Sequence, residues 1–447
     1  MKAVVLEEFG ADLALRDVPR PVPAAGEVLV RVAASGVNPL DTKIRAGAAA
    51  HARVTPPMIL GIDLAGIVAE VGPEVTGFAV GDEVYGMTGG VGDRPGSLAE
   101  YAAVDADLLA RKPARLSMSA AAALPLALIT AWEGLVDRAG TGAGDLVLVH
   151  GGAGGVGHVA VQLALARGAT VFATGSGASL DAIRRLGAEP IDYRATTAPE
   201  YVASATGGEG FDVIFDTVGG KTLDDSFAAV RTYTGHVVSI LGWGSHSLAP
   251  LSFRGATYSG VFTLLPLLTG RGRAHHGDIL AQAAALADAG LLTPMVDPTR
   301  FSLETVADAH RAVETGTSAG KVVVQVATPG GRRGTTRAFG RKGLHLRGRA
   351  RFSREEFEPH PPGQLAVAWA PRSRRTRGLA AQQAKEPVMG LGKQAKDKAK
   401  EIKGKVKKDT GKATGNNRLK VKGKAEELTG KLKLKGKGEK AKRAAKK

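Results

Sequence analysis

The chain of 447 residues has no cysteine. Without thiols it can form no disulfide bond, use no thiol nucleophile and bind no zinc through thiolates. It also lacks any run of about 18 uninterrupted apolar residues, so we expect no membrane-spanning helix. The segment Met1–Glu8 reaches acidic side chains too early for a secretory signal. Together these absences lead us to expect a cytoplasmic protein.

Positive and negative charges are separated along the chain. Residues 1–327 contain 24 Lys and Arg against 33 Asp and Glu, whereas residues 328–447 contain 36 against 10. The first part therefore carries a net charge of −9 and the second a net charge of +26. Such asymmetry predicts an acidic globular part followed by a basic extension.

A glycine-rich run in the first part has the spacing of a dinucleotide-binding turn. Leu146–Val149 is typical of a short apolar strand, and Val159–Ala166 is typical of a helix. Between them, Gly152, Gly154 and Gly157 fit the G-x-G-x-x-G pattern. Glycines let the backbone turn tightly and approach a pyrophosphate, which the amides at the helix N-terminus bind. A purely structural turn is the alternative, but the flanking strand and helix favour a dinucleotide site.

The remaining pattern predicts two kinds of domain. Short strands separated by turn residues are expected at Val28–Val32, Ala65–Val71 and Asp82–Tyr85, which indicates a small, mostly β domain. From about Ala131, strands alternate with helices, as in a parallel sheet with right-handed crossovers. The strands expected there are Leu146–Val149, Thr170–Ala173, Val213–Asp216 and His236–Leu241. The later elements are helices at Leu180–Leu186, Ile279–Ala289 and Leu303–Glu314, and a final strand at Lys321–Val326.

Several stretches carry a resemblance to a known superfamily. They are Gly36-Val37-Asn38-Pro39-Leu40-Asp41-Thr42-Lys43-Ile44-Arg45, Gly61-Ile62-Asp63-Leu64-Ala65-Gly66, Gly81-Asp82-Glu83-Val84-Tyr85-Gly86, Thr130-Ala131-Trp132-Glu133, the glycine turn and Ser318-Ala319-Gly320-Lys321-Val322-Val323-Val324. In their order and spacing, residues 1–327 resemble the medium-chain dehydrogenase/reductases, in particular the zinc-independent, ζ-crystallin-like quinone oxidoreductases. The resemblance implies an α/β fold. Residues 1–125 with 262–327 would form a GroES-like catalytic domain, and residues 126–261 a Rossmann nucleotide-binding domain with a doubly wound parallel sheet.

The chain departs from the zinc alcohol dehydrogenases at their metal ligands. Those relatives place a cysteine where this chain has Asn38, and a G-H-E turn where it has Gly61-Ile62-Asp63. We therefore expect no zinc and no other metal. Histidines such as His275 and His276, which lack the paired spacing of metal ligands, are expected to be structural or solvated.

The residues after the second nucleotide-domain strand favour NADPH over NADH. Enzymes that prefer NAD usually carry a carboxylate there, whereas this chain has Thr174-Gly175-Ser176-Gly177. Ser176 can donate a hydrogen bond, and the resemblance brings Tyr193 beside the adenosine phosphate. The basic residue that relatives often supply falls at Leu180. Another basic residue could take its place, and the candidates are Arg184, Arg185 and Arg194. Each of them could also be an ordinary surface charge.

Without a metal or a flavin motif, the expected chemistry is direct hydride transfer to a quinone or an α,β-unsaturated carbonyl. The resemblance implies that Asn38 faces the nicotinamide and the substrate, that Thr130 holds the carboxamide, and that Lys43 donates a proton or stabilises charge. The resemblance also implies coenzyme contacts by Gly155 and Val156, and we expect further contacts from Ile240 and Gly242. Without the resemblance, Asn38-Pro39 would be an ordinary turn and Asp41–Arg45 a solvated helix start.

Two alternative functions and an oligomeric state remain open. The chain could be a reductase-like interaction protein of the stress response, with a cationic tail that binds nucleic acid, or it could be an enoyl-thioester reductase. A homodimer is expected by analogy with the superfamily only.

The basic extension divides into two parts. Residues 328–388 are rich in Arg, Gly and Pro and sparse in apolar residues, which predicts a disordered linker. In residues 389–447, Ile402–Lys412 is repeated 19 positions later as Val421–Lys431. This part resembles the CsbD-like stress-response family, which implies a small, lysine-rich helical module. Its lysines could contact nucleic acid without sequence specificity, although a merely soluble polyelectrolyte is the simpler interpretation.

Overall fold

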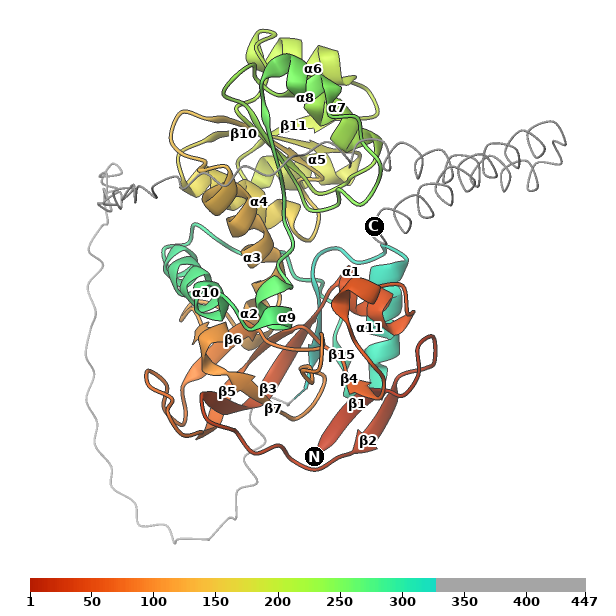
Figure 1. Ribbon diagram of the computed structural model, residues 1–447, viewed down its shortest axis with the longest axis vertical. Helices are drawn as coiled ribbons and strands as arrows, with labels where there is room; N and C mark the ends of the chain where they lie inside the picture. Colours follow the sequence, from red (N-terminus) through yellow and green to blue (C-terminus); the bar gives the residue numbers. More distant parts are fainter. Residues whose placement is uncertain (327–447) are drawn as a thin grey trace, which may run out of the picture. The chain divides into compact units, whose positions relative to one another are not determined.

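The computed structural model describes residues 1–326 (Figure 1). The predicted linker 328–388 and the predicted CsbD-like module 389–447 lie outside the described residues. None of the helices within residues 1–326 combines the length and the apolar character needed to cross a membrane.

The first lobe is built on two antiparallel-rich sheets, drawn mainly in red and orange in Figure 1. The larger sheet has seven strands in the order β15-β16-β3-β5-β6-β8, with β7 also paired to β3, and the smaller sheet has the order β2-β1-β4. The strands are β1 (Lys2–Leu6), β2 (Ala14–Asp17), β3 (Glu27–Val37), β4 (Met58–Ile59), β5 (Asp63–Val71), β6 (Glu83–Met87), β7 (Tyr101–Asp105), β8 (Leu109–Arg111), β15 (Phe301–Ser302) and β16 (Val322–Gln325). The accompanying helices are α1 (Pro39–Arg45), η1 (Ala50–Ala52), η2 (Ala106–Leu108), α2 (Met118–Ala122), α9 (Leu265–Thr269), α10 (Arg273–Asp288), η4 (Leu303–Thr305) and α11 (Val306–Glu314).

The second lobe is a six-stranded parallel sheet in the order β11-β10-β9-β12-β13-β14. Its strands are β9 (Leu146–His150), β10 (Thr170–Gly175), β11 (Glu189–Asp192), β12 (Val213–Asp216), β13 (His236–Ser239) and β14 (Thr257–Gly260). Its helices are α3 (Pro125–Trp132), the π-helix η3 (Glu133–Arg138), α4 (Gly157–Ala166), α5 (Ala178–Arg185), α6 (Ala198–Thr206), α7 (Lys221–Ala229) and α8 (Ala249–Arg254). The strand order reverses between β9 and β12, and ligands of such sheets bind outside the carboxyl ends of the strands at that point.

Both faces of the parallel sheet are covered by apolar side chains. Along β9, Val147 and Val149 belong to the main hydrophobic core, whereas Leu148 belongs to a separate cluster with Phe211 and Ile214. This burial on both faces explains why β9 is continuously apolar rather than alternating. The predicted fold class, a Rossmann-like parallel sheet with a mostly β GroES-like lobe, is confirmed for the described residues. The proposed domain boundaries stay a prediction.

Helix α4 ties the two lobes together. The Gln162 side chain donates to the carbonyl of Thr293 at 3.0 Å and accepts from its amide at 2.9 Å. One turn earlier, His158 Nδ1 bonds the carbonyl of Gly154 at 2.9 Å, while its Nε2 accepts from the amide of Met295 at 3.1 Å. The glycine turn is thus fixed through His158 to the segment that precedes β15.

Some element bounds differ from the prediction. Strand β13 ends at Ser239, because the chain from Ile240 leaves the sheet to line a cavity. Helix α10 begins at Arg273, six positions before the predicted start, since its polar first turn hides the apolar pattern. There His275 bonds Asp137 at 2.8 Å and His276 bonds Glu133 at 3.1 Å.

Candidate functional site

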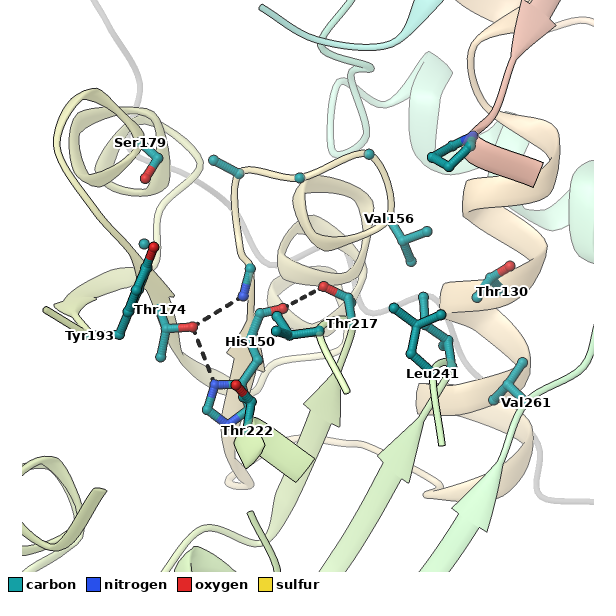
Figure 2. Close-up of a pocket in the computed structure, with 18 of the residues that line it drawn as sticks. Thr130, His150, Val156, Thr174, Ser179, Tyr193, Thr217, Thr222, Leu241 and Val261 are labelled. Atoms are coloured by element: carbon teal, nitrogen blue, oxygen red, sulfur yellow. Dashed lines mark hydrogen bonds between the residues drawn. The ribbon is translucent and has the colours of Figure 1, made fainter. Parts of the chain in front are cut away.

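A cavity of about 1270 Å³ lies at the carboxyl ends of β9, β10 and β12 and is also lined by the first lobe. Figure 2 shows part of it, where His150 ends β9, Thr174 lies near the end of β10 and Thr217 follows β12. Its volume exceeds that of an ordinary small-molecule pocket, about 300–1,000 Å³. The cavity therefore has room for a ligand as extended as a dinucleotide together with a second molecule.

The glycine turn forms one wall of this cavity. Gly154, Gly155 and Val156 line it, and α4 begins at Gly157, so the helix N-terminus can bind an anion there. Gly152 and Gly157 do not line the cavity. A Cβ on Gly157 would lie 2.0 Å from the carbonyl oxygen of Gly151, so this glycine permits the turn itself.

A set of hydrogen bonds fixes the strand ends beneath the turn (Figure 2). The Thr174 hydroxyl oxygen accepts from the amide of Gly151 at 3.1 Å and bonds His150 Nδ1 at 3.2 Å. The Thr217 hydroxyl donates to the carbonyl of His150 at 2.7 Å. Burial lowers the pKa of His150 to about 4, so the ring is neutral at physiological pH.

Hydroxyls and a guanidinium gather at the end of β10 and after β11. The Ser176 hydroxyl donates to the Tyr193 hydroxyl at 3.4 Å, and Arg194 lies with its guanidinium carbon 5.9 Å from the Tyr193 ring centroid. The bond from Ser176 and the Arg194 charge hold the pKa of Tyr193 below its ordinary value. Of the three candidate arginines, Arg194 lines the cavity, whereas Arg184 forms an exposed ion pair with Asp181 at 2.7 Å. Arg185 is not among the lining residues.

Asn38 lines the cavity from the first lobe, and both the nitrogen and the oxygen of its side-chain amide form hydrogen bonds. Its Nδ2 donates to Asp63 Oδ2 at 2.9 Å, and its Oδ1 accepts from the ammonium of Lys321. Its backbone amide donates to Asp41 Oδ2 at 2.8 Å, which fixes the start of α1. Asp63 is fixed in turn, because its Oδ1 accepts from the amide of Leu126 at 2.9 Å.

The ammonium and the two carboxylates of this cluster are all buried. Lys321 is 5% exposed, Asp41 2% and Asp63 not at all. Burial raises the pKa of Asp41 to about 7 and that of Asp63 to about 6, and Lys321 opposes both shifts. Burial likewise lowers the pKa of Lys321, opposed by the two carboxylates. The cluster places a cation directly behind the Asn38 amide.

The other two predicted catalytic residues also line the cavity. The Thr130 hydroxyl donates to the carbonyl of Leu126 at 2.7 Å, so its oxygen is free only to accept from a ligand. Lys43 is exposed on α1, and within residues 1–326 its ammonium has no hydrogen bond or ion pair. Among the remaining predicted contacts, Ile240 lines the cavity. Gly242 does not, because it packs against Tyr258, whose hydroxyl oxygen lies 2.3 Å from where a Cβ would be.

Three aromatic rings line the cavity near the first lobe. His51, on η1, stacks on Trp243 with ring centroids 5.0 Å apart and an interplanar angle of 29°. Phe262 meets His51 edge-on at 5.9 Å and Trp243 at 6.2 Å. We call these three residues the ring cluster. It joins η1 of the first lobe to the segments that follow β13 and β14.

Sequence reasoning missed several residues of this site. Asp63 and Lys321 stand in stretches that carry the superfamily resemblance, so their place in those stretches was a signal that could have identified them. Asp41 was treated as part of a helix start. Nothing in the sequence pointed to His51 or Trp243, because contacts between loops leave no periodic pattern.

In the part of the chain that the structure describes, no group of three or more His, Cys, Asp or Glu side chains is placed to hold a metal ion. The absence of metal stays a prediction.

Comparison with known proteins agrees with this architecture. Residues 24–114 match the alcohol dehydrogenase GroES-like domain, and residues 186–324 match the zinc-binding dehydrogenase family. The chain is 36% identical over 335 residues to the 2-methylene-furan-3-one reductase of Solanum lycopersicum, covering 72% of this chain and 79% of that protein. It is 30% identical over 320 residues to the quinone oxidoreductase of Sus scrofa, covering 70% and 94%.

A solved structure is similar as well. The crystal structure of an alcohol dehydrogenase superfamily protein from Novosphingobium aromaticivorans matches with a TM-score of 0.72 and 55% sequence identity. The match covers 73% of this chain and 100% of that one. The superfamily predicted from the sequence is thereby confirmed, and the chain belongs to the medium-chain dehydrogenase/reductase oxidoreductases.

Proposed function

We propose that this protein reduces quinones or α,β-unsaturated carbonyls by direct hydride transfer from NADPH, without zinc. The observation that carries the proposal is a single cavity that joins the glycine turn to Asn38, Lys43 and Thr130. One site then contains both an anion-binding helix N-terminus and donors for a developing negative charge. The relatives named as a furanone reductase and a quinone oxidoreductase support this substrate class.

The residues of the cavity fit a dinucleotide. The N-terminus of α4 would hold the pyrophosphate, and the Thr130 oxygen would accept from the nicotinamide carboxamide. When bound, the nicotinamide supplies a hydride to an electron-poor carbon of the acceptor. The protein orients the two molecules and keeps water from the reacting atoms.

Asn38 and Lys43 would stabilise the charge that develops on the acceptor oxygen. One amide hydrogen of Asn38 bonds Asp63, and we expect the second, which lies beside Asp41, to donate to that oxygen when the acceptor is bound. Because the Lys321 ammonium binds the amide oxygen, the amide cannot flip. Its nitrogen therefore stays on the side of Asp63. The Lys43 ammonium supplies a second positive charge at the same end of the cavity.

The preference for NADPH rests on Ser176, Tyr193 and Arg194. Their hydroxyls and guanidinium would bind the 2′-phosphate, and residues 174–177, where NAD-preferring enzymes usually carry a carboxylate, contain none. An Arg guanidinium is suited to phosphate because its planar donors match the oxygens.

The residues at the place of the zinc ligands do not fit zinc. Asn38 and Asp63 bond each other, and the Lys321 ammonium already binds the Asn38 oxygen. A dication at this point would lack thiolate ligands and would meet a buried positive charge.

The coenzyme preference is tested by replacing Arg194. We expect Arg194→Gln to weaken NADPH binding about 10-fold and to leave NADH binding unchanged, because one charge-assisted phosphate contact is lost. Arg184→Gln is the matched control, since Arg184 pairs with Asp181 on the surface. Fluorescence titration with each coenzyme measures both constants, and equal weakening for NADPH and NADH would contradict the assignment.

The reaction itself is tested with an acceptor panel. Purified full-length protein is assayed for NADPH oxidation with 1,4-benzoquinone, a cyclic enone and an enoyl thioester. Turnover with the quinone or the enone supports the proposal. Turnover with the thioester alone would favour the enoyl-thioester alternative, and no turnover with any acceptor would overturn the proposal. The homodimer and the nucleic-acid contact of the basic extension stay predictions.

A further inference from the structure

The reduction proposed above requires a proton as well as a hydride. The hydride adds to the β-carbon of an enone, the C=C electrons shift, and the carbonyl oxygen takes up the negative charge as an enolate. One proton must then reach the α-carbon or the oxygen to give the neutral product. The acceptor end of the cavity must therefore contain a group that releases a proton, or admit water that does.

Most titratable side chains at the acceptor end of the cavity already form hydrogen bonds within the protein. Lys321 donates to the oxygen of Asn38, and Asp41 and Asp63 accept from fixed amides. His150 has an unpartnered Nε2 within the described residues, but it is buried at the end of β9 beneath the glycine turn. Lys43 and His51 remain, and both line the cavity.

The His51 side chain is positioned by contacts of its ring with other aromatic rings, and not by hydrogen bonds to its nitrogens. The stack on Trp243 and the edge contact with Phe262 involve ring faces and edges, and no hydrogen bond engages either nitrogen of His51 among residues 1–326. The backbone around it is fixed, because the next residue, Ala52, is fully buried and its carbonyl accepts from the amide of Gly92 at 2.8 Å. The imidazole is thus held in the cavity wall, and neither of its ring nitrogens is engaged by another described residue.

His51 can also recover a proton. Its side chain is partly exposed, and Trp243, which covers it, is 61% exposed. The ring cluster therefore lies between the cavity and solvent, so an imidazole that has given up its proton can be reprotonated by water without opening the buried Asn38 cluster.

We propose that His51 is the general acid that completes the reduction, held in place by the ring cluster. Its imidazolium gives one N–H proton to the enolate, the N–H bond breaks as the new C–H or O–H bond forms, and the neutral ring takes a proton from water. This inference rests on the proposed reductase function. A planar acceptor would lie against the ring cluster, which directs this end of the cavity towards quinones and cyclic enones.

The test separates proton donation from stacking. His51→Phe keeps an aromatic ring against Trp243 but has no proton to give, and His51→Ala removes both. With a cyclic enone we expect kcat to fall about 100-fold or more in both variants, while the NADPH dissociation constant stays unchanged. Added imidazole should restore part of the kcat of His51→Ala and none of that of His51→Phe. His275→Ala, a histidine that pairs with Asp137, is the control and should behave as wild type.

The outcomes distinguish this inference from the function on which it rests. Wild-type kcat in His51→Phe, or a loss confined to KM that imidazole does not repair, would overturn the role of His51 and leave the reductase function intact. A wild-type protein that turns over no acceptor would overturn both.

Discussion

Replacing Lys321 should destabilise the protein in a way that depends on pH. Lys321→Met removes the ammonium that faces two buried carboxylates and leaves the Asn38 oxygen without its donor. At about pH 8 the variant must bury both carboxylates without a counter-charge. Breaking a buried pair by removing one partner costs about 3–5 kcal/mol, so we expect a loss of that size in the free energy of unfolding.

The sign of the pH dependence follows from the raised pKa values. The pKa values of Asp41 and Asp63 in the folded protein, about 7 and about 6, lie above the ordinary value of 3.8. The folded state therefore binds protons more tightly than the unfolded state, and these two groups make stability fall as pH rises from about 4 to about 7. Lys321 lowers both pKa values, so its removal raises them and steepens the fall. At about pH 5 both carboxyls are largely protonated, so the electrostatic part of the cost of Lys321→Met should disappear and only the lost hydrogen bond to Asn38 should remain.

Urea unfolding followed by intrinsic fluorescence at about pH 5 and about pH 8 measures this difference. Lys43→Met is the matched control, because Lys43 is exposed, and it should change stability little at either pH. Adding Asp63→Asn to Lys321→Met should restore part of the loss at the higher pH. An equal loss at both pH values would refute the electrostatic account of the cluster.

Two further substitutions test the turn and the core. Gly157→Ala should abolish coenzyme binding, because its Cβ would lie 2.0 Å from the Gly151 carbonyl oxygen; Gly142→Ala, whose Cβ has no neighbour nearer than 3.9 Å, should bind normally in the same fluorescence titration. Tyr85→Phe should lower the free energy of unfolding by about 0.5–1.5 kcal/mol, since it removes the buried hydrogen bond of 2.7 Å from the Tyr85 hydroxyl to the carbonyl of Leu280. An unchanged urea midpoint for Tyr85→Phe would contradict this.

The parts of the fold that local pattern determines could be predicted from the sequence. The apolar run 146–149 became β9, and the predicted strand Val213–Asp216 has the same bounds as β12. Both are buried on two faces, which leaves continuous apolar runs bounded by turn residues. Helix α10 was placed only in part, because its first turn is stabilised by bonds to Asp137 and Glu133 that sequence periodicity does not record.

The site was predictable where a motif or the family resemblance marks it. Gly154 of the glycine turn, Asn38, Thr130 and Tyr193 were named in this way and all line one cavity, and their functional roles stay predictions. The partners of Asn38 were not predicted, since Lys321 lies 283 positions away in the sequence. The ring cluster depends on how loops of the two lobes meet, and no local signal encodes that geometry.

The path of the hydride is the most direct test of the proposed chemistry. Full-length protein, treated with a strong chelator, would be given NADPH carrying deuterium at the transferred position of nicotinamide C4, together with a cyclic enone. The account predicts one deuterium at the β-carbon of the product, at a rate that the chelator does not change. Product without the label, or activity that disappears with the chelator and returns with zinc, would contradict it.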